Sequence, residues 1–136
     1  MRLAHKFSPV ALLLVLLLAS VGSAAVGGKM PDLKALGYVI TRPLTPLLIC
    51  ESGKEVYAIG YNKKGRENSR LFDAVAMYAS PKDPHNRPFA IVIFSGPSEI
   101  RSVYIDRNRD GKIDAEGQPG DPGVPIGPCG ILDGPR

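Results

Sequence analysis

The sequence is poor in the residue types from which most catalytic and metal sites are built. It has no tryptophan, two histidines and two cysteines in 136 residues. It contains no C-x-x-C, H-E-x-x-H or G-x-S-x-G motif and no phosphate-binding glycine-rich loop. Outside the first 25 residues the only histidine is His85, which lies between prolines in a predicted loop. We therefore expect a protein that is not an enzyme, with a hydrolase that uses His85 as the remaining alternative.

Long apolar runs are also missing, apart from one near the N-terminus. Residues 10–19, "VALLLVLLLA", are uncharged; Arg2 and Lys6 precede them, and the small residues "SVGSAA" follow. This order is typical of a secretory signal peptide, here cleaved after Ala24 or Ala25. The run is about half the roughly 20 residues that a membrane-spanning helix needs. We expect 1–25 to be a cleaved signal peptide and the protein to be periplasmic or secreted, without stable membrane insertion after cleavage; an uncleaved anchor is the alternative.

Net charge of either sign is low once that segment is removed. Without Arg2 and Lys6, the 17 Lys and Arg fall to 15, against 13 Asp and Glu. This balance argues against a nucleic-acid partner, which normally requires a clustered basic face. The basic stretch "NKKGRENSR" (62–70) fits a solvated hairpin loop, with a docking patch for an anionic envelope polymer as the alternative. The expected partner is an unidentified protein or an envelope polymer.

Two cysteines in an exported chain most simply form one disulfide, Cys50–Cys129. Closing a loop of that length stabilises the fold by about 4–5 kcal/mol in the chain-entropy model. Such a contribution matters for a mature domain of about 111 residues, which buries a smaller fraction of its surface than a larger one does. A free or intermolecular pair is the alternative.

Most of the chain between residues 37 and 105 has the pattern of short strands. Apolar, β-branched or aromatic segments separated by turn residues predict strands over 38–41, 47–50, 55–61, 71–79, 88–94 and 99–105. The Ser52-Gly53 pair suits a tight hairpin turn. "FAIVIF" within 88–94 is apolar throughout, which indicates a central strand covered on both sides. Residues 71–79 are rich in Ala and Met, so a two-turn helix is an alternative there.

These signals predict a mainly β fold, a small antiparallel sheet, sandwich or barrel over residues 26–116. Four tyrosines of the predicted strands could line a ligand groove, although packing with hydroxyls at the surface is commoner: Tyr57, Tyr61, Tyr78 and Tyr104. Residues 117–136 hold six Gly and five Pro, a composition that continues neither a strand nor a helix. We expect an extended, polyproline-like tail, folded back over the sheet if Cys129 reaches Cys50.

The most specific stretch is "IDRNRDGKIDAEG" (105–117), in which oxygen-bearing side chains alternate at Asp106, Asn108 and Asp110. Gly111 occupies the sixth position, where a sharp turn is needed, and Asp114 occupies the ninth. Over these nine positions the chain resembles the EF-hand calcium loop, D-x-[DN]-x-[DN]-G-x-I-D. The resemblance implies oxygen ligands for calcium and a core anchor at the eighth position.

The loop also departs from the EF-hand pattern. The twelfth position, normally a glutamate that clamps the ion, is Gly117, and Glu116 stands one residue early. A predicted strand enters the loop and a Gly/Pro segment leaves it, so no helix–loop–helix is available. The loop looks like the broader group of D-x-D-x-D-G calcium loops in exported proteins, such as dockerin-like and thrombospondin-repeat-like loops, which implies a structural role for the ion.

The expected ligand set is Asp106, Asn108, Asp110, Lys112 through its carbonyl, Asp114 and Glu116. Three basic residues within the loop weaken its attraction for a cation, so we expect calcium affinity of about 0.1–1 mM. Magnesium or manganese is a lesser alternative. So is a polar turn that holds no ion, with its carboxylates neutralised by Arg107 and Arg109.

The sequence thus favours a small exported, non-catalytic binding protein of the cell envelope, with a structural calcium loop. An exported inhibitor of a secreted or host hydrolase is the alternative. "CESGKEVYAIGY" (50–61) is similar to the start of periplasmic lysozyme inhibitors in its Cys, Gly, Val and Tyr, but the later pattern of that family does not reappear.

Overall fold

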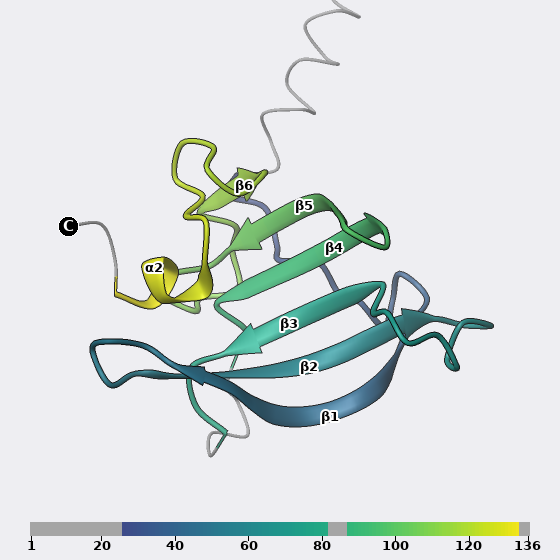
Figure 1. Cartoon of the computed structure of the whole chain (residues 1–136). Coiled ribbons are helices and arrows are strands. Elements are labelled where there is room, and N and C mark those ends of the chain that lie inside the picture. Colours follow the sequence, from purple (N-terminus) through teal and green to yellow (C-terminus); the bar gives the residue numbers. More distant parts are fainter. Residues whose placement is uncertain (1–25, 82–86, 134–136) are drawn as a thin grey trace, which may run out of the picture.

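Six antiparallel strands form one open sheet in a computed structural model that describes residues 26–81 and 87–133. The expected signal peptide (1–25), His85 and residues 134–136 lie outside the described residues. Neighbours in the sheet follow chain order: β1 (Tyr38–Ile49), β2 (Glu55–Lys63), β3 (Ala74–Tyr78), β4 (Ala90–Gly96), β5 (Glu99–Ile105) and β6 (Ala115–Gly117) (Figure 1). One short helix, α2 (Pro128–Leu132), follows. The mainly β prediction is confirmed, in its single-sheet form.

The β1–β2 hairpin closes where the sequence predicts it. The Cys50 N–H donates to the Lys54 carbonyl at 2.7 Å, and Gly53 turns the chain with φ 85°. The two strands predicted for 38–41 and 47–50 are one continuous edge strand, with register shifts around the prolines. Proline is tolerated there because the outer side of an edge strand needs no backbone donor.

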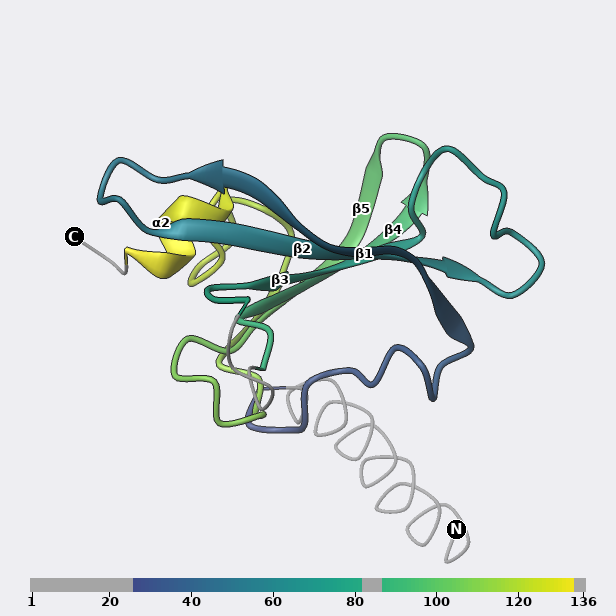
Figure 2. The same ribbon diagram turned by 90° about the horizontal axis from the view of Figure 1, so that it is seen from below.

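Side chains alternate between two faces of the sheet, and each face carries its own core. The first face carries a cluster built around Tyr61, Ala76 and Ile91, covered by the N-terminal segment 26–37. Figure 2 shows that segment running along one side of the sheet. β4 is buried on both sides, as its apolar sequence predicts. Residues 74–78 are a strand, so the helical alternative for this region is wrong.

The second face is covered by the tail, which is folded rather than extended. Val124 and Ile131 are buried against Val56, Val103 and neighbouring residues of the sheet. The prediction that the tail forms no helix is wrong: Pro128 begins one helical turn, a position where the missing proline N–H costs nothing. The Cys50–Cys129 disulfide ties this turn to the end of β1.

The disulfide is present as predicted and indicates an oxidising compartment. It joins cysteines 79 residues apart and holds the tail over the second core. Among the described residues, none of the helices has the length and apolar character needed to cross a membrane.

Reduction of the disulfide should lower the free energy of unfolding by about 4–5 kcal/mol, because the reduced unfolded chain regains loop entropy. Urea unfolding with and without dithiothreitol measures this difference. The Cys50→Ser/Cys129→Ser variant should coincide with the reduced protein and should not respond to the reductant. An unchanged unfolding midpoint after complete reduction would contradict the assigned role of the bond.

Candidate functional site

The loop that resembles a calcium site connects β5 to β6 and closes at its base through backbone hydrogen bonds. The Asp114 N–H donates to the Ile105 carbonyl at 2.7 Å, and the Asp106 N–H donates to the Phe89 carbonyl at 2.9 Å. Ile113 is buried, as expected for the anchor at the eighth position. Gly111 has φ 88°, the conformation that the predicted sharp turn requires.

Asp106 is fully buried and organises the loop through its carboxylate. Its Oδ2 accepts the Gly111 N–H at 2.8 Å, and its Oδ1 accepts the Asp110 N–H at 3.2 Å. Burial raises the pKa of Asp106; the two backbone hydrogen bonds oppose this rise, and the neighbouring Asp110 carboxylate adds to it. The sequence placed Asp106 at the first ligand position, and the structure adds its role in shaping the turn.

Asp110 and Asn108 lie beside that buried carboxylate. The Asp110 Oδ1 accepts the Lys112 N–H at 2.9 Å. The Asp110 carboxylate also interacts with the side chains of Asp106 and Asn108. The hydrogen bond from Lys112 is the largest cause that lowers the pKa of Asp110. The Asp110 N–H further approaches the Asn108 Oδ1 at 3.4 Å. The structure therefore brings the first three predicted side-chain ligands together.

The other predicted ligands lie differently. The Asp114 Oδ2 accepts the Arg107 N–H at 2.7 Å and closes the turn. Glu116 is on β6, with its Oε1 3.5 Å from the Ser102 hydroxyl. Within 26–81 and 87–133 the Lys112 carbonyl accepts no hydrogen bond, and no three His, Cys, Asp or Glu side chains form a metal-binding group. The side chains that the structure brings together are thus two carboxylates and one amide.

In the described part of the chain, Arg107 and Arg109 form no ion pair with the carboxylates of the loop. The Arg107 Nη1 donates to the Ile131 carbonyl in α2 at 3.1 Å, and Arg109 adopts φ 57°. Over the described part of the chain, the only ion pair joins Arg66 to Asp73, at 3.2 Å. The polar turn exists in its backbone hydrogen bonds, but the neutralisation by Arg107 and Arg109 that this alternative assumed is not made.

The N-terminal segment pairs with this loop, which the sequence analysis missed. The Ile113 N–H donates to the Gly28 carbonyl and the Gly27 N–H to the Ile113 carbonyl, both at 2.7 Å. The Met30 N–H donates to the Gly111 carbonyl at 2.8 Å. Residues 26–30 have no alternating pattern, so only the apolar Ile113 hinted at a partner. The pairing fixes the segment across the first face.

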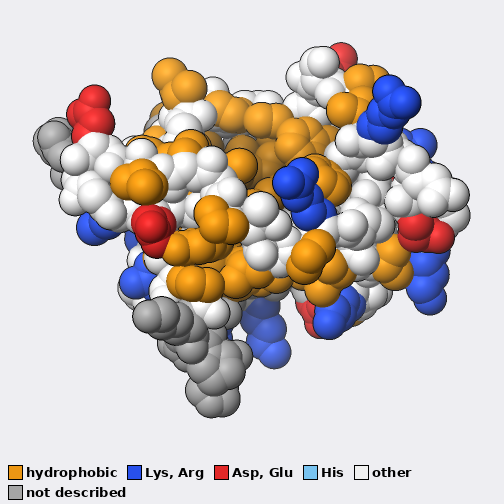
Figure 3. All heavy atoms as spheres, turned by 60° about the horizontal axis from the view of Figure 1, so that its bottom comes forward, with side chains coloured by type: hydrophobic (Ala, Val, Ile, Leu, Met, Phe, Trp, Pro, Cys, Tyr) orange, Lys and Arg blue, Asp and Glu red, His pale blue; other side chains and the backbone are white. Residues whose placement is uncertain are grey.

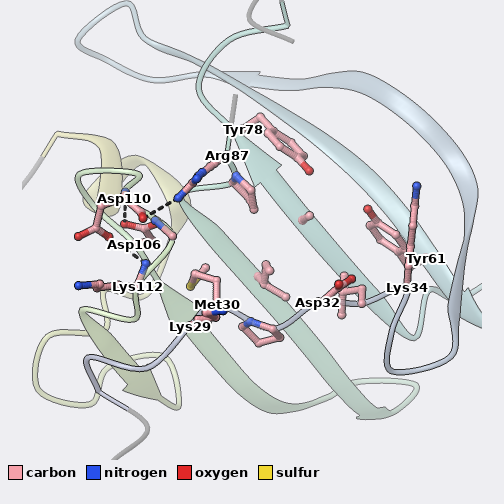
Figure 4. Close-up of a pocket in the computed structure, with 16 residues that line it drawn as sticks. Lys29, Met30, Asp32, Lys34, Tyr61, Tyr78, Arg87, Asp106, Asp110 and Lys112 are labelled. Carbon is pink, nitrogen blue, oxygen red and sulfur yellow. Dashed lines mark hydrogen bonds between the residues drawn. The ribbon is translucent and has the colours of Figure 1, made fainter. Parts of the chain in front are cut away.

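A groove of about 690 Å³ lies between that segment, the loop and the first face of the sheet (Figure 4). Its lining includes Met30 of the N-terminal segment, Ala76 and Ile91 of the sheet, and Asp106 and Asp110 of the loop. Its cationic side chains are Lys29, Lys34, Arg87 and Lys112. Arg87 is also bound to the loop, because its Nη1 donates to the Asp110 carbonyl at 2.6 Å. The groove and the loop therefore form one continuous surface.

Two of the tyrosines considered in the sequence lie in this groove. Tyr61 and Tyr78 both line the groove, and Figure 4 shows their hydroxyl oxygens pointing toward one another. Burial raises the pKa of Tyr78 to about 12, with further contributions from the charge and hydroxyl of Tyr61. Tyr61 is itself buried, so the two tyrosines both pack in the first core and line the groove. The cations Lys29, Lys34 and Arg87 were missed because only the strand register and the N-terminal pairing bring them together.

The basic stretch 62–70 makes internal contacts in part. Lys63 lies over the Tyr38 ring at 5.9 Å, and Arg66 is paired with Asp73. Burial alone would raise the pKa of Asp73. The hydrogen bonds from Lys63, Arg66 and Asn62 have a larger, opposite effect, so the pKa of Asp73 is lowered overall. Asn62 and Lys63 belong to β2, and Asn62 is buried, so the solvated loop predicted for 62–70 is confirmed only for residues 64–70.

Asp106→Ala should lower the free energy of unfolding by about 2–3 kcal/mol, because two backbone N–H groups lose a buried acceptor. Asp121→Ala is the matched control, since the exposed Asp121 carboxylate accepts one N–H, from Gln118 at 2.8 Å. Its cost should be about 1 kcal/mol. Urea unfolding of the two variants in chelator measures the difference; equal costs would show that Asp106 does not organise the loop.

Tyr78→Phe should reduce the loss of stability at alkaline pH. The pKa of Tyr78 is raised above 10.0 by folding, so its contribution to stability is complete below pH 10 and disappears as pH rises through about 12. The wild type should therefore lose more stability than Tyr78→Phe between these values. Urea unfolding at stepped pH measures this, with Tyr104→Phe, a change at another tyrosine that packs against the first core, as the control. Parallel curves for wild type and Tyr78→Phe would contradict the assignment.

Comparison with known proteins gives no family for this chain. No protein-family model, no curated protein and no solved structure matches it. Its function has therefore to be argued from the loop and the groove themselves.

Proposed function

We propose that the chain is an exported, non-catalytic binding protein whose 106–112 loop holds a calcium ion. One observation carries the proposal: the carboxylates of Asp106 and Asp110 meet inside the loop, beside the Asn108 amide, without an ion-paired cation among the described residues. Calcium prefers carboxylate, amide and carbonyl oxygens. A divalent ion between these groups is therefore the simplest source of the missing positive charge.

The electrostatic reason is the repulsion between the two carboxylates. Two like charges about 4 Å apart repel by about 1–4 kcal/mol at effective dielectric constants between those of water and a protein surface. The Asp106 carboxylate is fully buried, which increases its need for a counter-charge. Its backbone hydrogen bonds use one lone pair on each oxygen and leave others for an ion.

The ligand set is narrower than the sequence suggested. Asp106, Asn108 and Asp110 would supply side-chain oxygens, and Lys112 would supply its unbonded carbonyl. Asp114 holds the Arg107 N–H and would act through a water molecule. Glu116 lies on β6 and is left out of the set. Water would complete the six to eight ligands that calcium takes.

The affinity should be low, about 0.1–1 mM, because few protein ligands are available and basic side chains lie nearby. Arg87 donates to the Asp110 carbonyl within the same loop, and Lys112 is itself a loop residue. Millimolar calcium outside the cell would still fill such a site. The disulfide, which indicates an oxidising compartment, is compatible with that environment.

The ion would have a structural role. The loop carries Ile113 into the core and pairs with Gly28 in the N-terminal segment, so ordering it orders one wall of the groove. Binding would then take place on the surface that the loop supports. No catalytic step is assigned to these residues.

Calcium should raise the free energy of unfolding by about 2 kcal/mol at about thirty times its dissociation constant. Isothermal titration calorimetry and thermal unfolding in calcium or in chelator measure this effect. Asp110→Asn should abolish most of the response, because it removes an exposed ligand charge and leaves the core intact. Asp121→Asn is the matched control, since its carboxylate also accepts one backbone N–H in a turn.

Two outcomes would contradict the proposal. The first is no heat of calcium binding together with unchanged melting in excess chelator. The second is equal stabilisation of wild type and Asp110→Asn, which would place the ion elsewhere. A titration with magnesium tests the choice of ion, and magnesium that stabilises as well as calcium at the same concentration would overturn the assignment to calcium.

A further inference from the structure

We propose that the groove on the first face binds a small amphipathic anion, an apolar or aromatic body that carries a carboxylate, phosphate or sulfonate group. This inference goes beyond the calcium proposal and does not depend on it. Its support is the combination of an apolar floor, two tyrosine hydroxyls and four cationic side chains around one concave surface (Figure 4).

The size and floor of the groove suit a small organic molecule. Its volume of about 690 Å³ falls within the range of about 300–1,000 Å³ typical of small-molecule sites. Met30 and Leu33 of the N-terminal segment pack in one core with Ala76 and Ile91 of the sheet, and parts of these side chains line the groove. An apolar body laid against this lining would remove apolar surface from water, which favours binding.

The charges around the groove favour an anion. Lys29, Lys34, Arg87 and Lys112 contribute four cations, and in the described part of the chain none of them has an acidic side chain within ion-pair distance. Figure 4 shows Arg87 at one end of the groove and Lys34 at the other. An anionic head group can therefore meet a cation at either end, with the body across the floor.

The acidic residues of the groove are already engaged with the backbone. The Asp32 Oδ1 accepts the Ala35 N–H at 3.3 Å. Asp106 and Asp110 accept the backbone N–H groups of their own loop. These carboxylates keep their charge, and of the three only Asp106 is buried, while all four cations of the groove are exposed. With four cations against three carboxylates, the groove keeps a formal excess of one positive charge.

The tyrosine hydroxyls provide orientation within the groove. Tyr61 and Tyr78 direct their hydroxyls toward one another in the groove, and each hydroxyl has two acceptor lone pairs and one O–H donor. One of these donors can turn to an anionic oxygen near the middle of the groove. A ligand would thus find hydrogen-bonding groups between the two cationic ends.

Two other grooves serve as internal comparisons. An apolar groove of about 270 Å³ on the second face has Arg42 at its rim and Leu47 and Phe72 in its walls. Figure 3 shows hydrophobic side chains gathered on one face of the molecule around a hollow. A third groove, of about 700 Å³, includes Arg101 and the Arg66–Asp73 pair. In that groove the acidic side chain already pairs with one of the cations.

The test uses two fluorescent probes that differ in one group. 1-Anilinonaphthalene-8-sulfonate carries a sulfonate, and N-phenyl-1-naphthylamine has the same rings without it. Both are titrated into the purified protein in excess chelator, so that failure of the calcium proposal cannot change the result. We expect saturable binding of the sulfonate probe at least about tenfold tighter than that of the neutral probe, the value of one charge-assisted hydrogen bond.

Substitutions then locate the site. Lys34→Gln/Arg87→Gln should weaken the sulfonate probe about tenfold or more and the neutral probe less than about twofold. Arg42→Gln and Arg101→Gln, at the other two grooves, are the matched controls and should leave both affinities unchanged. All three variants change exposed side chains, and thermal unfolding verifies that they remain folded.

Several results would overturn the inference. Equal affinities for the two probes would show that the cations take no part. A loss of binding in Arg42→Gln or Arg101→Gln, but not in the double variant, would move the anion to another groove. Binding to phosphatidylglycerol vesicles without binding of the monomeric probe would show that the cations recognise a membrane surface instead of a free small molecule.

Discussion

The buried carboxylate of Asp106 is the interaction on which the rest of the site depends. By accepting the N–H groups of Asp110 and Gly111, it sets the curvature of the loop, and that curvature brings Asp110 beside it. The same curvature directs Ile113 into the core and exposes its backbone to the N-terminal segment. A charged group without a charged partner is costly to bury, so the loop is held in a shape that a cation would stabilise. The loop that Asp106 shapes thus provides the backbone groups that bind the N-terminal segment and one wall of the groove.

The two covers of the sheet are held by different means. The tail is fixed over the second face by a covalent bond at Cys129 and by the burial of Ile131. The N-terminal segment is fixed over the first face by backbone hydrogen bonds to the 111–113 region. Arg107 links the two systems, because it belongs to the loop and donates to a carbonyl of α2. The loop therefore contacts both the N-terminal segment and the tail, so a ligand bound to the loop would affect the stability of both cores.

Local patterns predicted the sheet well and the site only in part. Alternation in β2, the apolar run of β4 and the Ser52-Gly53 turn depend on neighbouring residues, and the structure agrees with all three. The alternation of acidic and amide residues predicted that Asp106, Asn108 and Asp110 lie close together, and in the structure Asp110 interacts with the other two. Glu116 was assigned to the loop because it is near in sequence, but strand pairing with β5 directs it to Ser102. The helix at Pro128, the continuity of β1 and the groove depend on contacts between distant segments, which periodicity does not report.

The pairing of Gly27 and Gly28 with Ile113 has a consequence for the order in which the chain assembles. A contact between the first and last quarters of the described residues forms only when nearly the whole chain is available. The bond between Cys50 and Cys129, which spans 79 residues, imposes the same delay on the opposite face. A meander of adjacent hairpins can form early, since its contacts are local. The apolar side chains on both faces of that meander then remain exposed to solvent until the loop and the tail pack on them. In this interval the sheet is most prone to aggregation and to proteolysis.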